Sequence, residues 1–114
     1  MYGSWNLENL AERNIAPGVV HKLAWGDNLM LSLVTLEPYA VLPTHSHPHE
    51  QMGILISGAV ELALSDEIRP LSKNTMFLIS GMIMHALQAG PEGAVLVEAF
   101  SPPRDDYKEA GPGD

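Results

Sequence analysis

The chain has 114 residues, a formal net charge of −8 and no cysteine. Its length fits one domain with a single hydrophobic core, and the lack of cysteine excludes disulfides, thiolate metal ligands and thiol catalysis. Nucleic-acid binding needs a basic surface, so the excess of 14 acidic over 6 basic side chains argues against that function.

The predicted elements are almost all β-strands. Residues 4–12 predict one short helix, capped by Ser4 or Asn6. Nine prolines and ten glycines divide the chain into short segments, as is typical of all-β domains. The eight strand-like runs are residues 19–25, 29–36, 51–57, 59–65, 68–71, 75–80, 85–89 and 94–100.

The connections between these runs predict how the chain folds. Ser57 and Gly58 predict a tight hairpin turn, and residues 90–93 (GPEG) predict a loop. The run 29–36 is mostly apolar, so we expect it to be buried on both faces. The whole pattern predicts a small all-β sandwich or barrel. We expect one domain, residues 1–114, with a core over about 17–101 and a polar tail at 102–114 whose end is mobile.

Three of the five histidines lie in the stretch THSHPHEQ, residues 44–51. On an extended segment, His45 and His47 point to the same side, so both imidazoles could reach one metal ion. His49 and Gln51 share this phase, but Pro48 must bend the segment, so we expect only some of the four side chains to converge. An exposed histidine-rich turn is the alternative.

A metal site is favoured over that turn by the surroundings of the histidines. The cluster leads directly into an apolar strand, and a further histidine, His85, stands between two apolar runs. If the strands close into a barrel, its interior would bring these side chains together.

The spacing resembles the first motif of the cupins, which are small β-barrel (jelly-roll, or double-stranded β-helix) proteins. His45 and His47 are followed after three residues by Gln51, where cupins carry Glu, and after six more by Gly58. The histidine of the second cupin motif corresponds to His85. The resemblance implies the cupin fold and one divalent metal ion held by these three histidines and Gln51. At the other positions of the second motif the chain carries Asn74, Ser80, Met82 and Ala89 instead of Gly, Pro, Gly and Asn.

A glutamine in place of glutamate changes the expected chemistry of the metal. Three neutral imidazoles and a neutral amide leave the charge of a divalent ion uncompensated. Such an ion would be held less tightly but would attract an anionic oxygen more strongly. Imidazole and oxygen donors suit Ni, Zn, Mn, Fe or Cu. The alternative is a cupin without metal, in which Gln51 forms ordinary hydrogen bonds.

A second group of residues lies near the C-terminus. Glu98 and Phe100 share one face of the last strand, and Arg104 follows a Pro-Pro pair. Taken singly, they could be a surface carboxylate, a core side chain and a salt bridge to Asp105 or Asp106. As a group they resemble the acid, Phe and Arg of the pectin-degradation cupins, whose acid is Asp.

That resemblance implies an isomerase that converts 4,5-unsaturated monouronates into linear keto acids. Glu98 would then move a proton, Phe100 would pack against the substrate, and Arg104 would bind its carboxylate. Two other classes stay open. One is a cupin-type dioxygenase or polyketide cyclase, and the other is a non-catalytic cupin that binds a small molecule such as a sugar.

The expected partners follow from the same features. We expect a small, carboxylated substrate and a homodimer, with the N-terminal segment and an edge strand at the interface, because exposed strand edges need cover. No apolar run approaches the roughly 18 residues of a membrane span. The lack of cysteine and the acidic N-terminal stretch favour a cytoplasmic protein.

Overall fold

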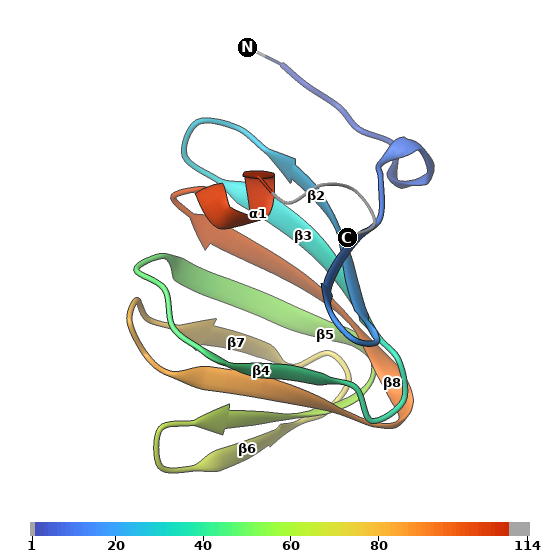
Figure 1. Ribbon diagram of the computed structural model, residues 1–114, viewed down its shortest axis with the longest axis vertical. Coiled ribbons are helices and arrows are strands. Elements are labelled where there is room, and N and C mark those ends of the chain that lie inside the picture. Colours follow the sequence, from blue (N-terminus) through green and yellow to red (C-terminus); the bar gives the residue numbers. More distant parts are fainter. Residues whose placement is uncertain (1, 110–114) are drawn as a thin grey trace.

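Two long antiparallel strands, β5 (Glu50–Leu64) and β8 (His85–Ser101), form the centre of the fold. The computed structural model describes residues 2–109 (Figure 1). The remaining elements are the 3-10 helix η1 (Leu7–Asn9), the strands β1 (Arg13–Ala16), β2 (Val19–Trp25), β3 (Met30–Leu36), β4 (Val41–His45), β6 (Ile68–Leu71) and β7 (Met76–Ile79), and the helix α1 (Asp105–Glu109).

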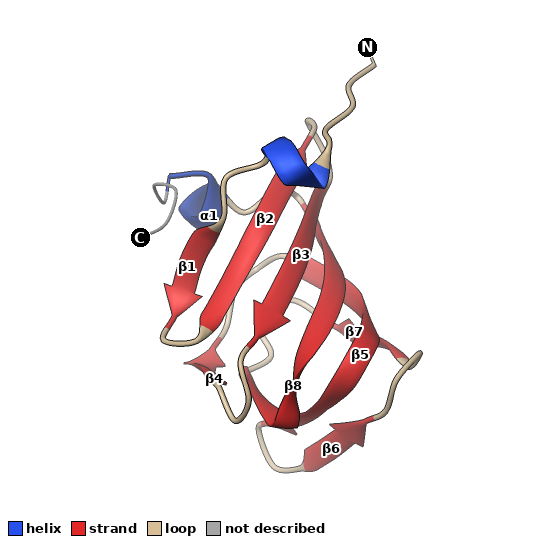
Figure 2. Cartoon of the chain, turned by 90° about the vertical axis from the view of Figure 1, so that its right-hand side faces the viewer, coloured by secondary structure: helices blue, strands red, loops and turns tan. Residues whose placement is uncertain are grey.

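The strands form one eight-stranded antiparallel sheet that folds into a barrel-like shape. Its order is β1-β2-β3-β8-β5-β6, with β4 paired to β8 and β7 paired to β5. The C-terminal half of β8 lies between β3 and the first half of β5, whereas its N-terminal half lies between β4 and the second half of β5. Each long strand therefore takes part in both of these groups of paired strands, which form the two walls of the barrel (Figure 2). The all-β fold class is confirmed.

The two long strands bend together where the sequence predicted a hairpin turn and a loop. Gly58 pairs with Ala94, but Val60 already pairs with Ala89, so residues 90–93 have no partner on β5. Gly58 has a φ of +78°, whereas Ser57 is not among the residues with positive φ. A two-residue type I′ turn needs positive φ at both central residues. The hairpin prediction is wrong, because Glu50–Leu64 form one continuous strand whose pairing with β8 shifts register just before and just after Ser57 and Gly58. The predicted loop is likewise a bulge within β8.

Residues of β3 alternate between the interior and the outer surface. Met30, Ser32, Val34 and Leu36 are buried, and Leu31 is 56% exposed. The prediction that this run is buried on both faces is therefore wrong. An antiparallel strand can leave one face uncovered by helices, and here that uncovered outer face is itself apolar.

The interior contains two apolar clusters with polar side chains between them. The larger cluster includes Leu55, Leu87 and Leu96, and the smaller consists of Leu23, Met30 and Phe100. Burying polar groups is unfavourable unless they find partners. A group of buried polar side chains therefore marks the candidate site. The buried polar side chains are His21, Ser32, His47, Gln51, His85, Glu98 and Arg104.

The ends of the chain differ most from the prediction. The expected helix at 4–12 is reduced to η1, whose cap is Asn6, with Oδ1 accepting a hydrogen bond from the Glu8 amide at 2.9 Å. The strands β1 and β4 were not predicted. Part of the predicted tail folds as α1, and its predicted mobile end lies outside the described residues. Among the described residues, no helix is long and apolar enough to cross a membrane.

We predict that Gly58→Ala destabilises the protein strongly. A Cβ atom at Gly58 would lie 2.0 Å from the carbonyl oxygen of Gly93 and 2.9 Å from the Cα of Ala94. Backbone displacement together with the left-handed φ should lower the free energy of unfolding by roughly 2–4 kcal/mol. Urea unfolding followed by tryptophan fluorescence measures the change.

Gly26→Ala is the matched control, because a Cβ atom at Gly26 meets nothing within 4 Å. If Gly58→Ala unfolded at the same urea concentration as the Gly26 variant, the bend would not depend on glycine.

Candidate metal centre

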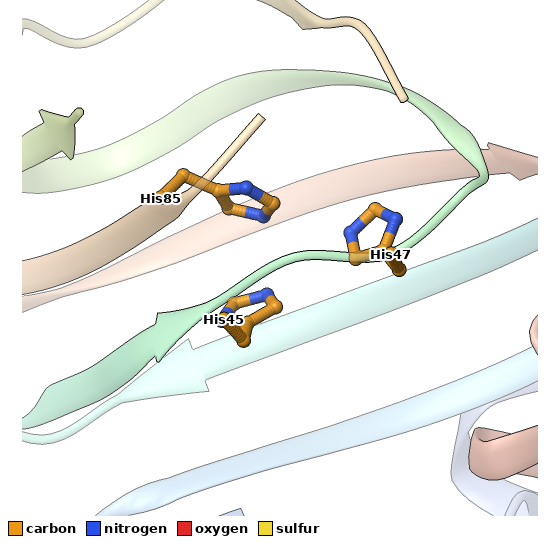
Figure 3. Close-up of side chains that lie close together, drawn as sticks. All are labelled: His45, His47 and His85. Atoms are coloured by element: carbon orange, nitrogen blue, oxygen red, sulfur yellow. The ribbon is translucent and has the colours of Figure 1, made fainter. Parts of the chain in front are cut away.

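Three histidines from two paired strands and one loop converge inside the barrel. His45 ends β4, His47 follows in the loop, and His85 begins β8, where it pairs with His45. Their ligand nitrogens all lie within 4.8 Å of one another, and Figure 3 shows the three imidazoles grouped together. Both His47 and His85 are buried. The predicted convergence of these histidines is therefore observed.

Backbone carbonyls fix the protonation of two of these rings. Nδ1 of His45 donates to the carbonyl of Pro43 at 2.8 Å, and Nδ1 of His85 donates to the carbonyl of Ile83 at 2.7 Å. A carbonyl can only accept, so in each neutral ring the lone pair is on Nε2. Nε2 of His85 is buried without a hydrogen-bond partner among the described residues. Metal-binding histidines are typically oriented in this way.

Burial also favours the neutral form of two of the rings, those of His47 and His85. Burial, followed by the positive charge of Arg104, lowers the pKa of His47 to about 4. Burial likewise lowers the pKa of His85, although its hydrogen bond to Ile83 opposes the shift. Neutral imidazole is the form that binds a metal. The donor set and the unpaired Nε2 atom of His85 therefore fit a divalent cation.

Gln51 and Glu98 add an oriented oxygen to this group. Gln51 is buried on β5, and its Nε2 donates a hydrogen bond to Oε2 of Glu98 on β8. Since a carboxylate only accepts, this bond turns the amide oxygen of Gln51 toward the histidines. Oε1 of Gln51 lies 3.1 Å from Nε2 of His47. Glu98 thus determines which atom of Gln51 faces the candidate site.

Glu98 is buried in the barrel wall, with 3% of its surface exposed. Burial raises its pKa to about 7, against the opposing effects of the Gln51 hydrogen bond and the charge of Arg104. Its carboxyl group can therefore gain or lose a proton near neutral pH, as a general acid or base must.

His49 does not join the convergent group. It is half-buried, and the centre of its ring lies 5.4 Å from that of His47. The residues from 46 to 49 are a loop and not a strand, so the period-two relation ends at Pro48. This agrees with the expectation that only some of the side chains in the stretch converge.

Arg104 and Phe100 complete the set of predicted residues. Phe100 is buried next to the histidines, with 5.8 Å between the centres of its ring and that of His47. The guanidinium carbon of Arg104 lies 5.2 Å from the centre of the Phe100 ring and 3.7 Å from that of Tyr107. Arg104 forms the salt bridge to Asp106 that the sequence offered as an alternative; Arg104 itself is buried, whereas the side chain of Asp106 is 60% exposed.

A cavity of about 370 Å³ is lined by one of the convergent histidines, His45, and by Arg104. His21, Asp106 and Tyr107 also line it. Its volume falls in the range of small-molecule sites, which is roughly 300–1,000 Å³. The arrangement can therefore place a small ligand against a metal and a cation at once.

Sequence reasoning did not assign His21 or Tyr107 to the site, and it named Asp106 only as an alternative salt-bridge partner of Arg104. His21 shares its inward phase with the apolar residues of β2, which was the available signal. Its Nδ1 lies 3.4 Å from the hydroxyl of Ser32, its ring meets that of Tyr107 edge-on, and burial lowers its pKa to about 4. The other two residues lie on α1, in a segment whose proline-rich sequence indicated a polar tail.

The comparisons with known sequences agree with this geometry. The sequence pattern of the cupin domain family matches residues 32–100. The pectin degradation protein KdgF of Dickeya dadantii (strain 3937) is 30% identical over 95 residues, which cover 82% of this chain and 86% of that protein.

Solved structures give the same result. KdgF from Halomonas sp. aligns with a TM-score of 0.84 at 31% identity, covering 93% of this chain and 99% of that one. An RmlC-like cupin from Shewanella frigidimarina NCIMB 400 aligns with a TM-score of 0.83, covering 94% of this chain and 96% of its own; at 22% identity it supports the fold alone. From its sequence motif, its relatives and its fold, the chain belongs to the cupin family.

Proposed function

We propose that the protein is a metal-dependent isomerase that opens a 4,5-unsaturated monouronate to the linear keto acid. The observation that carries this proposal is the cavity that His45, one of the three convergent histidines, lines together with the buried Arg104. The buried carboxyl group of Glu98 is linked to the histidines through Gln51. The two KdgF relatives support pectin degradation as the setting.

His45, His47, His85 and the amide oxygen of Gln51 would hold the ion. When bound, a divalent ion supplies Lewis-acid polarisation of substrate oxygens. All four donors are neutral, so they leave its charge available to an anionic ligand. The sequence and the structure accept Ni, Zn, Mn or Fe equally.

Glu98 would move the proton that the isomerisation requires. The anomeric hydroxyl loses a proton, the bond between C1 and the ring oxygen breaks to release an enolate at C5, and C4 gains a proton as the enolate becomes a ketone. One carboxyl group with a pKa of about 7 can accept the first proton and donate the second, so that no net proton is consumed. Arg104 would bind the substrate carboxylate, and Phe100 would pack beside it and exclude water.

The protein should bind one divalent metal ion per chain, and His85→Ala should weaken that binding roughly 100-fold or more. The substitution removes an inward lone pair that has no other partner among the described residues. Calorimetric titration of Zn²⁺ into chelator-treated protein measures the affinity. His49→Ala is the control, because that histidine lies outside the convergent group, and equal affinities for both variants would contradict the assigned ligands.

The metal-loaded protein should accelerate the loss of enol-ether absorbance of an unsaturated monouronate. Glu98→Gln should lower kcat by about 10²–10⁴, because it removes the proton-transferring group while keeping nearly the same volume. Glu61→Gln, an exposed residue of the same type on β5, should have no effect. A wild-type rate equal to that of the uncatalysed reaction would contradict the function. Saturable binding without turnover would instead indicate a non-catalytic sugar-binding cupin.

We also propose a homodimer that uses the apolar outer face of the sheet. Two rows of apolar residues run in register across β3, β8, β5 and β7. Several of them are at least half exposed, among them Leu31, Met52 and Leu78. The N-terminal residues Trp5 and Leu7 border the same face. A continuous apolar face on a small protein indicates an interface. The rows are Leu31–Ala99–Met52–Leu78 and Leu33–Val97–Ile54–Met76.

Light scattering should give the wild-type protein twice the mass of one chain, and Met52→Glu should give a single chain. The charge would be buried at the centre of the proposed interface, where it has no partner. Ile68→Glu is the control, since Ile68 is equally apolar and 63% exposed but belongs to β6. A monomeric wild-type protein, or a dimer that survives Met52→Glu, would contradict this interface.

A further inference from the structure

The guanidinium group of Arg104 is fixed by two neighbours from α1. Its plane is set by Tyr107, whose ring centre lies 3.7 Å from the guanidinium carbon. Its rotation within that plane is set by Asp106. Nε donates to Oδ1 of Asp106 at 3.2 Å, and Nη2 donates to Oδ2 at 2.8 Å. A two-bond fork of this kind fixes both the position and the direction of an arginine.

The fork uses only one edge of the guanidinium. Nη1 stands on the other edge and is buried without a hydrogen-bond partner among the described residues. A buried donor without a partner is unfavourable, and Arg104 lines the cavity that also reaches His45.

We propose that Asp106 is a positioning residue: it holds one edge of Arg104 so that Nη1 meets the carboxylate of a ligand in the cavity. This inference rests on the proposed function, because it assigns the carboxylate-binding group of that site. It also restricts how Arg104 binds. The Nε–Nη2 edge is already occupied, so the ligand is bound through the edge that carries Nη1.

Asp106 has two opposite effects on a bound carboxylate, and the geometry decides between them. Its negative charge repels a second anion and offsets part of the charge of Arg104. Its fork, however, removes the rotational freedom of a long side chain before the ligand arrives, which lowers the entropy that binding must overcome. Because Asp106 and the ligand would use different edges, the positioning effect dominates. The side chain of Asp106 is 60% exposed, so solvent also screens its repulsion.

Calorimetric titration of D-galacturonate and its uncharged methyl ester into the Zn²⁺-loaded protein tests this inference. The wild-type protein should prefer the acid, and Asp106→Asn should reduce that preference about tenfold. Asp106→Glu, which can form the fork again, should restore part of it. A role in stability alone would weaken the binding of acid and ester alike.

Asp105→Asn is the matched control, because it removes the same charge one residue away. Asp105 is exposed, and its ion-pair partner among the described residues is Lys108, at 3.6 Å. The Asp105→Asn variant should keep the wild-type preference for the acid over the methyl ester. If Asp106→Asn kept or increased the preference for the acid, or if the wild-type protein showed no preference, the inference would be wrong. A preference that depends on Asp106 in a protein that does not isomerise unsaturated monouronate would reject only the proposed reaction.

Discussion

The hydrogen bond between Gln51 and Glu98 is the interaction on which the candidate site depends. It joins the two central strands inside the barrel, where an unpaired carboxylate would be strongly unfavourable. The bond partly offsets the burial of Glu98 and turns the amide oxygen of Gln51 toward His47. One contact therefore determines both the environment of Glu98, the candidate acid–base group, and the orientation of Gln51, the fourth candidate ligand. A glutamate at position 51 would place two carboxyl groups against each other.

The bend of β5 and β8 determines where this contact lies. On one side of Gly58 the two strands carry Gln51, Glu98 and Phe100, and on the other side β8 begins with His85. Since both strands cross from one wall to the other, the residues of the site come from segments that are distant in sequence. The larger apolar cluster fills part of the interior, and two of the buried polar side chains, His21 and Arg104, line the cavity.

The sequence predicted the fold class and the convergence of the histidines, because both follow from local patterns. The spacing of His45 and His47 predicts proximity on an extended segment, and the two side chains do converge, with His47 in the loop that follows β4. The continuity of β5 and β8 was not predictable in this way. A glycine with positive φ suits a hairpin and a bulge equally well, and only pairing with distant strands decides between them. The contribution of α1 was missed for the same reason, because the burial of Arg104 depends on tertiary packing and not on its neighbours in sequence.

We infer that His45, His47, His85 and Gln51 form one metal site that faces a carboxylate-binding arginine. A crystal structure of the protein with Zn²⁺ and D-galacturonate, with anomalous scattering recorded at the zinc edge, is the decisive test. We expect one ion about 2.0–2.2 Å from a nitrogen of each of the three histidines and from the Gln51 oxygen. The ligand carboxylate should lie against Nη1 of Arg104. An ion bound elsewhere, or a ligand carboxylate directed away from Arg104, would show that the site is assigned wrongly.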